Sequence, residues 1–391
     1  MKTISNQKRK SNLKLLYILA FMLALATAMP AYIESSYIQQ FVSIKWVSLF
    51  FLGANLFALA AIFCFPKLIK KYHNNKVSEV VLFFYFLALV WMAIANSAWL
   101  IFVAFALLVI CSTLIWINMD IFVESYSLNA STGKTRTIFF TCLNAGWILA
   151  PMISGYFIGL GGYRIVYLAA ALALAPFYVV FIKKTRQLKD RNKYVKLDIV
   201  QTCKKIYRNK NLRGIFSAAI LLSVFYSAAV VYIPVYLTQT LGFSWSTLGI
   251  LFSIMLLPFV LFELPAGIVA DKYWGEKELL YTGFGILVLS LLLFFGVRST
   301  SAIVWGSILF LSRVGASLVE AMRETYFFKI VNVEDVSLID FFRSSIPLGY
   351  ILGTGLGVLI SLVLPINYTF LIVAMVMASG FYFIKIIKDT K

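Results

Sequence analysis

The chemistry available to this chain depends on a few ionisable side chains inside long apolar runs. Arg313 lies near the middle of one run, and Glu263 interrupts another, two residues before Pro265. Asp120 and Glu320 occupy corresponding places late in two further runs. An ionisable group near the centre of a bilayer costs at least about 2.5 kcal/mol on insertion scales. We therefore treat each of these residues as a candidate for substrate binding or proton coupling.

The candidate residues follow helical spacing on two segments. Steps of three, four and seven residues place side chains on one face of a helix. The first face holds Thr113, Asp120 and Glu124, and the second holds Arg313, Ser317, Glu320 and Glu324. Each face is polar in an otherwise lipid-compatible helix, so we expect both to look into a central cavity.

The guanidinium of Arg313 must meet a partner, because an uncompensated cation is not tolerated at that depth. Its candidate protein partners are Glu263, Asp120 and Glu320. If the partner is instead a substrate anion, Arg313 is a binding residue. A structural pair is equally compatible with the sequence, and the two readings stay open here.

Glu34 is the acidic residue closest to the outer side, after Pro30 of the first run. A buried carboxyl group holds its proton near neutral pH, which a proton-coupling site needs. Glu34 and Glu263 are therefore the candidate proton carriers, although a solvated Glu34 at the interface is the alternative. The aromatic candidates for substrate contact lie in the seventh run and include Tyr226, Tyr232 and Tyr236.

The elements that position these residues are transmembrane helices. Of 391 residues, 61% are hydrophobic and 13% are charged, whereas soluble domains use about 25% charged residues. Runs long enough to cross about 30 Å of hydrocarbon recur along the chain. The twelve candidate spans are 15–33, 46–65, 80–95, 99–119, 137–158, 165–182, 215–237, 248–270, 279–297, 303–322, 345–364 and 368–387.

The net charge of +19 is explained by basic residues that lie almost entirely on one side of a membrane. With a cytoplasmic N-terminus, all but four of the 35 Lys and Arg residues fall on the cytoplasmic side. The exceptions are Lys45, Arg164, Arg298 and Arg313. By the positive-inside rule, both termini are expected in the cytoplasm and the protein in the plasma (inner) membrane. No nucleic-acid partner is expected.

A basic, polar stretch divides the chain into an N-terminal six-helix bundle (1–182), a cytoplasmic linker (183–212) and a C-terminal six-helix bundle (213–391). Motifs repeat between the halves about 200 positions apart. The segment from Asp120 to Tyr126 returns as Glu320 to Tyr326, and Pro30-Ala-Tyr32 returns as Pro234-Val-Tyr236. The sequence therefore predicts an all-α integral membrane protein of two pseudo-symmetric bundles, with a site at their interface.

Several motifs together resemble the major facilitator superfamily. The segment 267–277, with Gly267, Asp271, Lys272 and Gly275, is similar to that family's loop between spans eight and nine. The segment 144–155 resembles the small-residue and proline motif of its fifth span, and 161–164 resembles the entry to its sixth. The equivalent first-half loop has Pro66 and Lys70 where glycine and aspartate belong. The resemblance covers nearly the whole chain and implies a twelve-span transporter, closest to drug and metabolite exporters.

The resemblance also implies a cytoplasmic gate. Its residues here are Glu124, Arg136, Asp271, Lys272, Glu324 and Arg343. A static ion-pair network is the alternative to a gate. In the fifth span, Gly146 and Gly155 allow close helix approach and Pro151 permits a bend, so these three are candidate hinge or packing residues.

The predicted function is secondary active transport of a small organic molecule by alternating access, as proton-coupled efflux by an antiporter. Uptake of an anionic metabolite or nutrient and a transport-inactive sensor with the same fold are the alternatives. No catalytic cluster points to an enzyme, and the asymmetry of Arg313 against Thr113 disfavours a channel. No cofactor or metal is expected, and we expect a monomer whose partners are substrate, protons and lipid.

Overall fold

Twelve helices in the structure are long and apolar enough to cross a membrane, as the sequence predicts. The structure is a computed structural model, described over residues 6–126, 132–185, 199–331 and 336–388. Backbone N–H and C=O groups in hydrocarbon must be satisfied within the segment, which leaves the helix as the form that each apolar run can take. Residues 186–198 of the predicted linker lie outside the described part.

The first half places each apolar run in one long helix. Its elements are α1 (Asn6–Ala31), α2 (Glu34–Ile38), α3 (Ile44–Tyr72), α4 (Asn74–Ile94), α5 (Ala98–Tyr126), α6 (Thr132–Gly161) and α7 (Tyr163–Thr185). Helix α1 packs against α6 and α7, while α5 packs against α3 and α4. Six of the seven helices are spans, and the short α2 follows the first of them.

The second half repeats this plan with more interruptions. Its elements are α8 (Ile199–Arg208), α9 (Lys210–Val235), a π-helical turn (Tyr236–Thr240), α10 (Trp245–Lys272), α11 (Glu276–Gly296), α12 (Ala302–Ile330), α13 (Val336–Arg343), α14 (Ser345–Ser361), α15 (Tyr368–Ala378) and α16 (Gly380–Ile386). The π-helical turn extends α9 beyond Pro234, and α15 and α16 form one span broken at Ser379.

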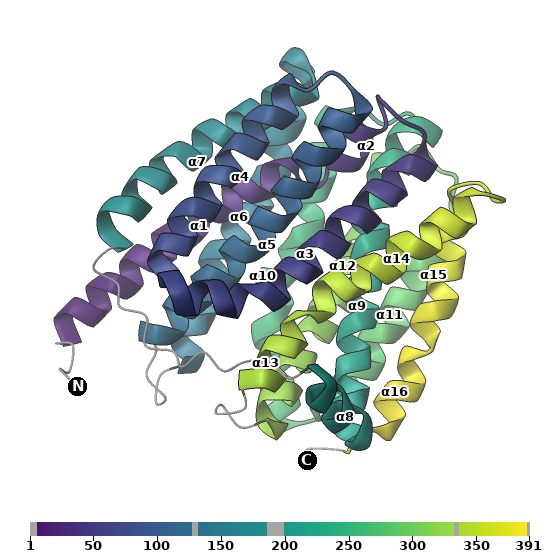
Figure 1. Cartoon of the computed structure of the whole chain (residues 1–391). Helices are drawn as coiled ribbons and strands as arrows, with labels where there is room; N and C mark the ends of the chain where they lie inside the picture. Colours follow the sequence, from purple (N-terminus) through teal and green to yellow (C-terminus); the bar gives the residue numbers. More distant parts are fainter. Residues whose placement is uncertain (1–5, 127–131, 186–198, 332–335, 389–391) are drawn as a thin grey trace.

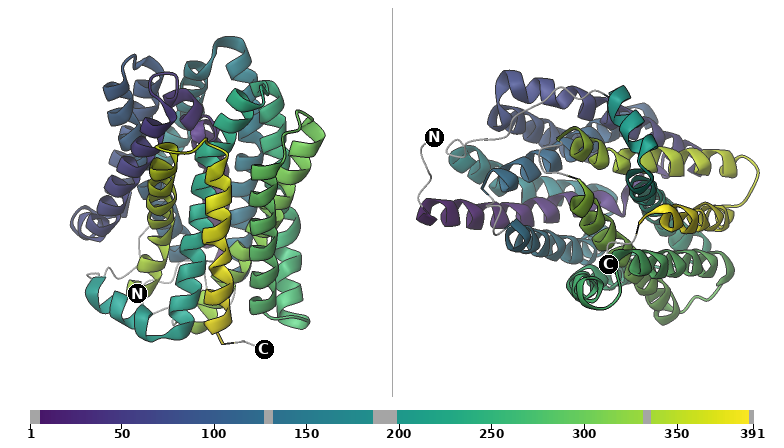
Figure 2. Two further views of the ribbon diagram at one scale, coloured as in Figure 1. Left: turned by 90° about the vertical axis from the view of Figure 1, so that its right-hand side faces the viewer. Right: turned by 90° about the horizontal axis from the view of Figure 1, so that it is seen from below.

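The bundle has two distinct ends (Figures 1 and 2). The first residues of α1, the last residues of α16, and helices α8 and α13 lie at one end, which we call the terminal end. Helix α2 lies at the opposite end, which we call the far end. The spans run between these two ends.

Two helix crossings join the halves, α6 with α10 and α3 with α14. At the first crossing the backbones meet at glycines. A Cβ atom added to Gly155 would lie 2.5 Å from the carbonyl oxygen of Trp245, and one added to Gly249 would lie 2.7 Å from that of Pro151. Such distances are shorter than real Cβ contacts, so only glycine permits this approach.

The same packing recurs inside each half. Gly146 of α6 approaches α1, where an added Cβ would lie 2.8 Å from that of Ala24. Gly349 of α14 approaches α9 at Ser223 in the same manner. The fifth and eleventh spans are thus equivalent partners of the first and seventh, which confirms the two pseudo-symmetric bundles. The packing role of Gly146 and Gly155 is visible here, whereas a hinge at Pro151 stays a prediction.

Candidate functional site

Arg313 is fully buried in α12 and packs on aromatic rings of α9. It is 1% exposed. Its guanidinium carbon lies 5.4 Å from the ring centre of Phe225 and 5.7 Å from that of Tyr226. The negative faces of aromatic rings attract a cation, and the attraction is larger where water is excluded. The two rings therefore hold Arg313 in place but leave its hydrogen-bond donors unused.

The guanidinium of Arg313 has no carboxylate partner in the described part of the chain. Its Nε and Nη1 are buried and donate no hydrogen bond to any of the described residues. None of the predicted partners, Glu263, Asp120 and Glu320, forms an ion pair with it. Each unsatisfied buried polar group costs about 1–3 kcal/mol, and more when it is charged.

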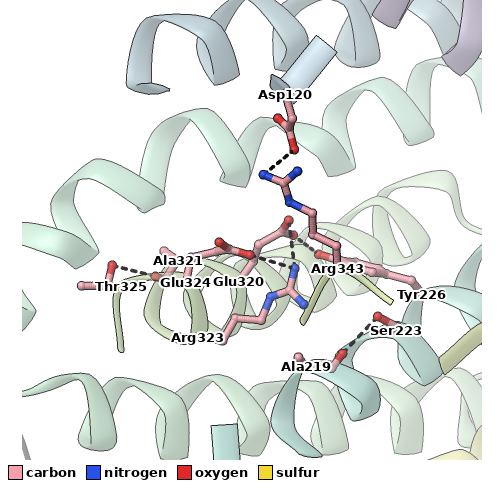
Figure 3. Close-up of polar contacts among 10 residues, drawn as sticks. All are labelled: Asp120, Ala219, Ser223, Tyr226, Glu320, Ala321, Arg323, Glu324, Thr325 and Arg343. Atoms are coloured by element: carbon pink, nitrogen blue, oxygen red, sulfur yellow. Dashed lines mark hydrogen bonds and ion pairs between the residues drawn. The ribbon is translucent and has the colours of Figure 1, made fainter. Parts of the chain in front are cut away.

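A chain of polar contacts continues along α12 toward the terminal end (Figure 3). The hydroxyl group of Tyr226 donates a short hydrogen bond to Oε2 of Glu320. Nη2 of Arg323 lies 3.8 Å from Oε1 of Glu320 and 3.6 Å from Oε1 of Glu324. The side chain of Arg323 is 6% exposed, whereas those of Glu320 and Glu324 are 36% and 40% exposed. The polar face of α12 thus becomes accessible toward the terminal end.

Arg323 is a residue that the sequence reasoning missed. It was counted with the basic residues at the cytoplasmic surface, yet it is buried, and its guanidinium lies 5.6 Å from the ring centre of Phe342. The available signal was its place three residues after Glu320 and directly before Glu324. Basic residues at the ends of spans usually face water, so spacing alone does not distinguish Arg323 from a surface residue.

An ion pair joins the two halves near the terminal end. Nη2 of Arg343, at the end of α13, lies 3.4 Å from Oδ2 of Asp120 in α5. Their side chains are 24% and 30% exposed. Figure 3 shows Arg343 reaching across to Asp120 beside the cluster of Glu320, Arg323 and Glu324. The sequence assigned Asp120 to the substrate site and Arg343 to the gate, and the structure brings these two residues together.

The other residues predicted for the gate add little evidence for or against it. The side chains of Glu124, Arg136 and Asp271 lie outside the described residues. Lys272 is exposed at the last residue of α10. Glu324 contributes to the polar chain on α12 through Arg323.

Glu263 belongs to the same region as the α12 carboxylates. It is half-buried in α10, which packs along α12, and it lies within electrostatic reach of Glu320 and Glu324. Three acidic groups therefore gather on the terminal-end side of Arg313.

Glu34 lies apart from this cluster, in α2 at the far end. It is buried, and burial raises the pKa of its carboxyl group from 4.5 to about 8. Tyrosines surround this part of the first half: the ring of Tyr37 lies 5.1 Å from that of Tyr167 and 5.8 Å from that of Tyr163. The hydroxyl of Tyr37 donates to the carbonyl oxygen of Met92 at 2.7 Å. The solvated alternative for Glu34 does not describe this structure.

The halves are in direct contact at the far end. Nε2 of Gln39 donates to Oε1 of Gln239 at 2.9 Å, and the hydroxyls of Ser48 and Tyr232 lie 2.8 Å apart. These contacts hold the two halves together at the far end, and Tyr232 takes part in them. The partly exposed carboxylates of α12 lie toward the opposite end.

Tyr236 is not brought near Arg313. Its ring packs against Trp305 and Phe370 at 5.8 and 5.6 Å, and its hydroxyl accepts a hydrogen bond from Nη1 of Arg298 at 3.0 Å. This aromatic cluster lies inside the second half toward the far end. Tyr226, six residues before Tyr232 on α9, contacts the candidate site.

Comparison with known proteins identifies the same architecture. A sequence model described as the Major Facilitator Superfamily matches residues 15–339. A search of curated protein sequences gives no significant match.

Several solved transporters share the fold. A bacterial homologue of the human lysosomal transporter Spinster, in an inward-facing and unoccupied conformation, matches with a TM-score of 0.68 and 12% identity, covering 98% of this chain and 96% of that one. The nucleoside transporter NupG gives 0.71 and 14%, covering 96% and 100%. A POT family transporter in complex with a thioalcohol-conjugated peptide gives 0.75 and 11%, covering 96% of each chain. At these identities the similarity concerns the fold alone.

Proposed function

The chain belongs to the major facilitator superfamily, and from that premise we propose that this secondary transporter carries a small organic anion bound by Arg313. The observation that carries the proposal is the buried guanidinium with two unused donors and no carboxylate partner among the described residues. A structural arginine at this depth is expected to be paired. A carboxylate or phosphate group on the substrate would supply the missing acceptor with the paired geometry that a guanidinium favours.

The substrate reaches Arg313 from the terminal end. The far end is closed by the contacts of Gln39 with Gln239 and of Ser48 with Tyr232. Toward the terminal end, Glu320 and Glu324 are accessible, and the pair of Asp120 and Arg343 links the halves. In alternating access, the contacts at the two ends break in turn, so the pair of Asp120 and Arg343 opens before substrate enters from the terminal end. We assign the pair of Asp120 and Arg343 to the gate at the terminal end.

Protons are the proposed coupling ion. Glu34 supports this role because its raised pKa, about 8, lets the carboxyl group gain and lose a proton near physiological pH. Glu263 is the second candidate, since it lies near two other carboxylates. A carboxyl group that changes charge between the two access states links proton movement to the movement of the halves.

The terminal end is proposed to face the cytoplasm of the plasma membrane. The distribution of Lys and Arg residues supports this orientation. Efflux from the cytoplasm by a monomer stays a prediction from the sequence. Substrate uptake into right-side-out and inside-out vesicles separates efflux from the alternative, uptake of an anionic nutrient.

The test is ligand-dependent thermal stability of the purified protein. A ligand that binds the folded state raises the melting temperature, and the rise grows with the logarithm of the ligand concentration above Kd. We expect organic anions to stabilise the parent protein, and this shift to vanish in Arg313→Ala and to persist in part in Arg313→Lys. Arg323→Ala is the matched control, because it removes a buried arginine of the same helix that already contacts Glu320 and Glu324.

The control separates a binding role from a structural one. Arg323→Ala is expected to lower the melting temperature yet keep the anion-dependent shift. Equal stabilisation of the parent and of Arg313→Ala by anions would remove Arg313 from the binding site. Stabilisation by hydrophobic cations in both proteins would favour drug-like efflux and make Arg313 structural.

A further inference from the structure

Helix α8 is separated from the span that follows it by one capping residue. Asn209 has an extended backbone (φ −95°, ψ 112°), and its Oδ1 accepts hydrogen bonds from the backbone N–H groups of Asn211 and Leu212 at 2.9 and 3.3 Å. This conformation caps α9 and interrupts the helical path before it. Helix α8 therefore turns away from α9 and lies crosswise to the spans at the terminal end (Figure 2).

One edge of α8 is held by the bundle. Thr202 is buried and Ile206 is half-buried, and the helix packs against α9 and α13. Residues four apart lie on one face, so these two side chains define the edge that faces the protein. The remaining faces of α8 are turned away from it.

The face of α8 beside the edge of Thr202 and Ile206 is apolar and exposed. It consists of Ile199, Val200, Cys203 and Tyr207, which we call the α8 strip. Val200 and Tyr207 are 63% and 73% exposed, and Ile199 is 41% exposed. Single exposed apolar residues are ordinary, but a continuous apolar face on a short helix beside a membrane span is the pattern of a helix lying in the interface.

A basic face borders the α8 strip. Lys204 and Arg208, four residues apart, are both exposed, and Lys210 and Arg213 follow in the first turn of α9. The guanidinium of Arg213 lies 5.6 Å from the ring centre of Tyr207, so the two faces meet. The sequence holds no Asp or Glu from 199 to 262. This surface therefore complements an anionic partner.

We propose that α8 is an interfacial helix that binds anionic phospholipid headgroups in the leaflet at the terminal end. The α8 strip enters the boundary between headgroups and acyl chains, while Lys204 and Arg208 contact lipid phosphates. The position of α8 along the membrane normal supports a lipid partner. The helix ends two residues before the span Lys210–Thr240 begins, so it lies at the height of the membrane surface. The proposal needs only that the spans lie in a membrane and is independent of the substrate.

The experiment measures the depth of Cys203, which lies on the α8 strip. In full-length protein whose other three cysteines are serine, Cys203 carries an environment-sensitive fluorophore. The protein is placed in nanodiscs of phosphatidylcholine alone or of phosphatidylcholine with phosphatidylglycerol at a ratio of about 3:1. We expect quenching by lipids with a doxyl group near the headgroup to be roughly twofold stronger in the anionic discs and to weaken at high salt. Strong quenching by aqueous iodide with equal, weak doxyl quenching in both discs would overturn the proposal.

Charge-reversal variants test the assignment to α8. Lys204→Glu with Arg208→Glu is expected to lower doxyl quenching in the anionic discs to the level in phosphatidylcholine. The matched control is Lys183→Glu with Lys184→Glu, an equal charge change on exposed residues at the end of α7. The control is expected to leave the quenching unchanged, and an equal loss in both variants would overturn the proposal. If either variant fails to fold, the proposal is still tested by the comparison of lipids and salt in the protein that keeps Lys204 and Arg208.

Discussion

Glu34 makes a residue-scale prediction about pH. Its carboxyl group titrates near 4.5 when unfolded and near 8 in the folded protein. The folded state therefore holds the proton more tightly, so stability is highest below pH 4.5, falls as the pH rises to 8, and then levels off. Glu34→Gln removes this dependence and is expected to be more stable than the parent above pH 8. Thermal unfolding of the purified protein from pH 5 to 9 measures it.

A second carboxyl variant serves as the control for Glu34. Glu278 is exposed at the start of α11, and Glu278→Gln is expected to follow the parent at every pH. If the parent and Glu34→Gln lost stability in parallel between pH 5 and 8, Glu34 would not be the buried proton carrier.

The pair of Asp120 and Arg343 makes the second residue-scale prediction. Arg343→Asp places two carboxylates where an ion pair joined the halves, and their repulsion is expected to open the terminal end. The double variant Asp120→Arg with Arg343→Asp restores attraction and is expected to recover the parental distribution. A cysteine at Ser317, on the buried α12 face, reports the change through its labelling rate with an impermeant thiol reagent. Identical labelling in all three proteins would exclude this pair from the gate.

At the same scale, spacing alone could predict which residues of α12 share a face. The partners of those residues could not be predicted. Asp120 and Arg343 meet because two halves are packed together, and no local pattern encodes that contact. Tyr236 was expected in the cavity, yet Arg298 and Trp305 hold it in an aromatic cluster instead. That Arg313 packs on Phe225 and Tyr226 and not against a carboxylate likewise depends on tertiary packing.

At the scale of helices, the crossing of α6 and α10 makes a packing prediction. Gly155→Leu forces a side chain into the backbone at Trp245, and overpacking of this kind costs about 1–3 kcal/mol or more. We expect a lower melting temperature and loss of substrate transport. The matched control is Gly159→Leu on the same helix, where an added Cβ meets nothing within 4 Å. Tolerance of both substitutions would show that the crossing is not tight in the membrane.

The helices themselves could be predicted because hydropathy and length are local properties. All twelve apolar runs expected from the sequence are candidate membrane spans in the structure. Helices that correspond in the two sequence repeats occupy corresponding positions in the two halves. The breaks were not predicted. The π-helical turn after Pro234, the interruption at Ser379 and the separate helices α2, α8 and α13 arise from capping and tertiary contacts that composition does not reveal.

For the whole molecule, the far-end closure predicts that transport requires its opening. Cysteines at Gln39 and Gln239, joined by a reducible bifunctional thiol reagent in a background free of the four native cysteines, are expected to abolish transport. Reduction is expected to restore it. The single cysteine variants, treated with the same reagent, control for modification alone. Full transport by the crosslinked double variant would mean that the halves need not separate at this end.

The unpaired charge of Arg313 also bears on how the carrier responds to voltage. With the anionic substrate proposed above, a loaded carrier differs from an empty one by the charge of the anion, so at least one half of the cycle moves net charge unless a proton travels with the substrate. Each elementary charge moved across 100 mV is worth about 2.3 kcal/mol. An imposed potassium diffusion potential in proteoliposomes therefore reports whether transport moves net charge. Voltage-independent transport indicates that protons compensate the charge of the anion in full, whereas acceleration at one polarity gives the sign of the uncompensated charge.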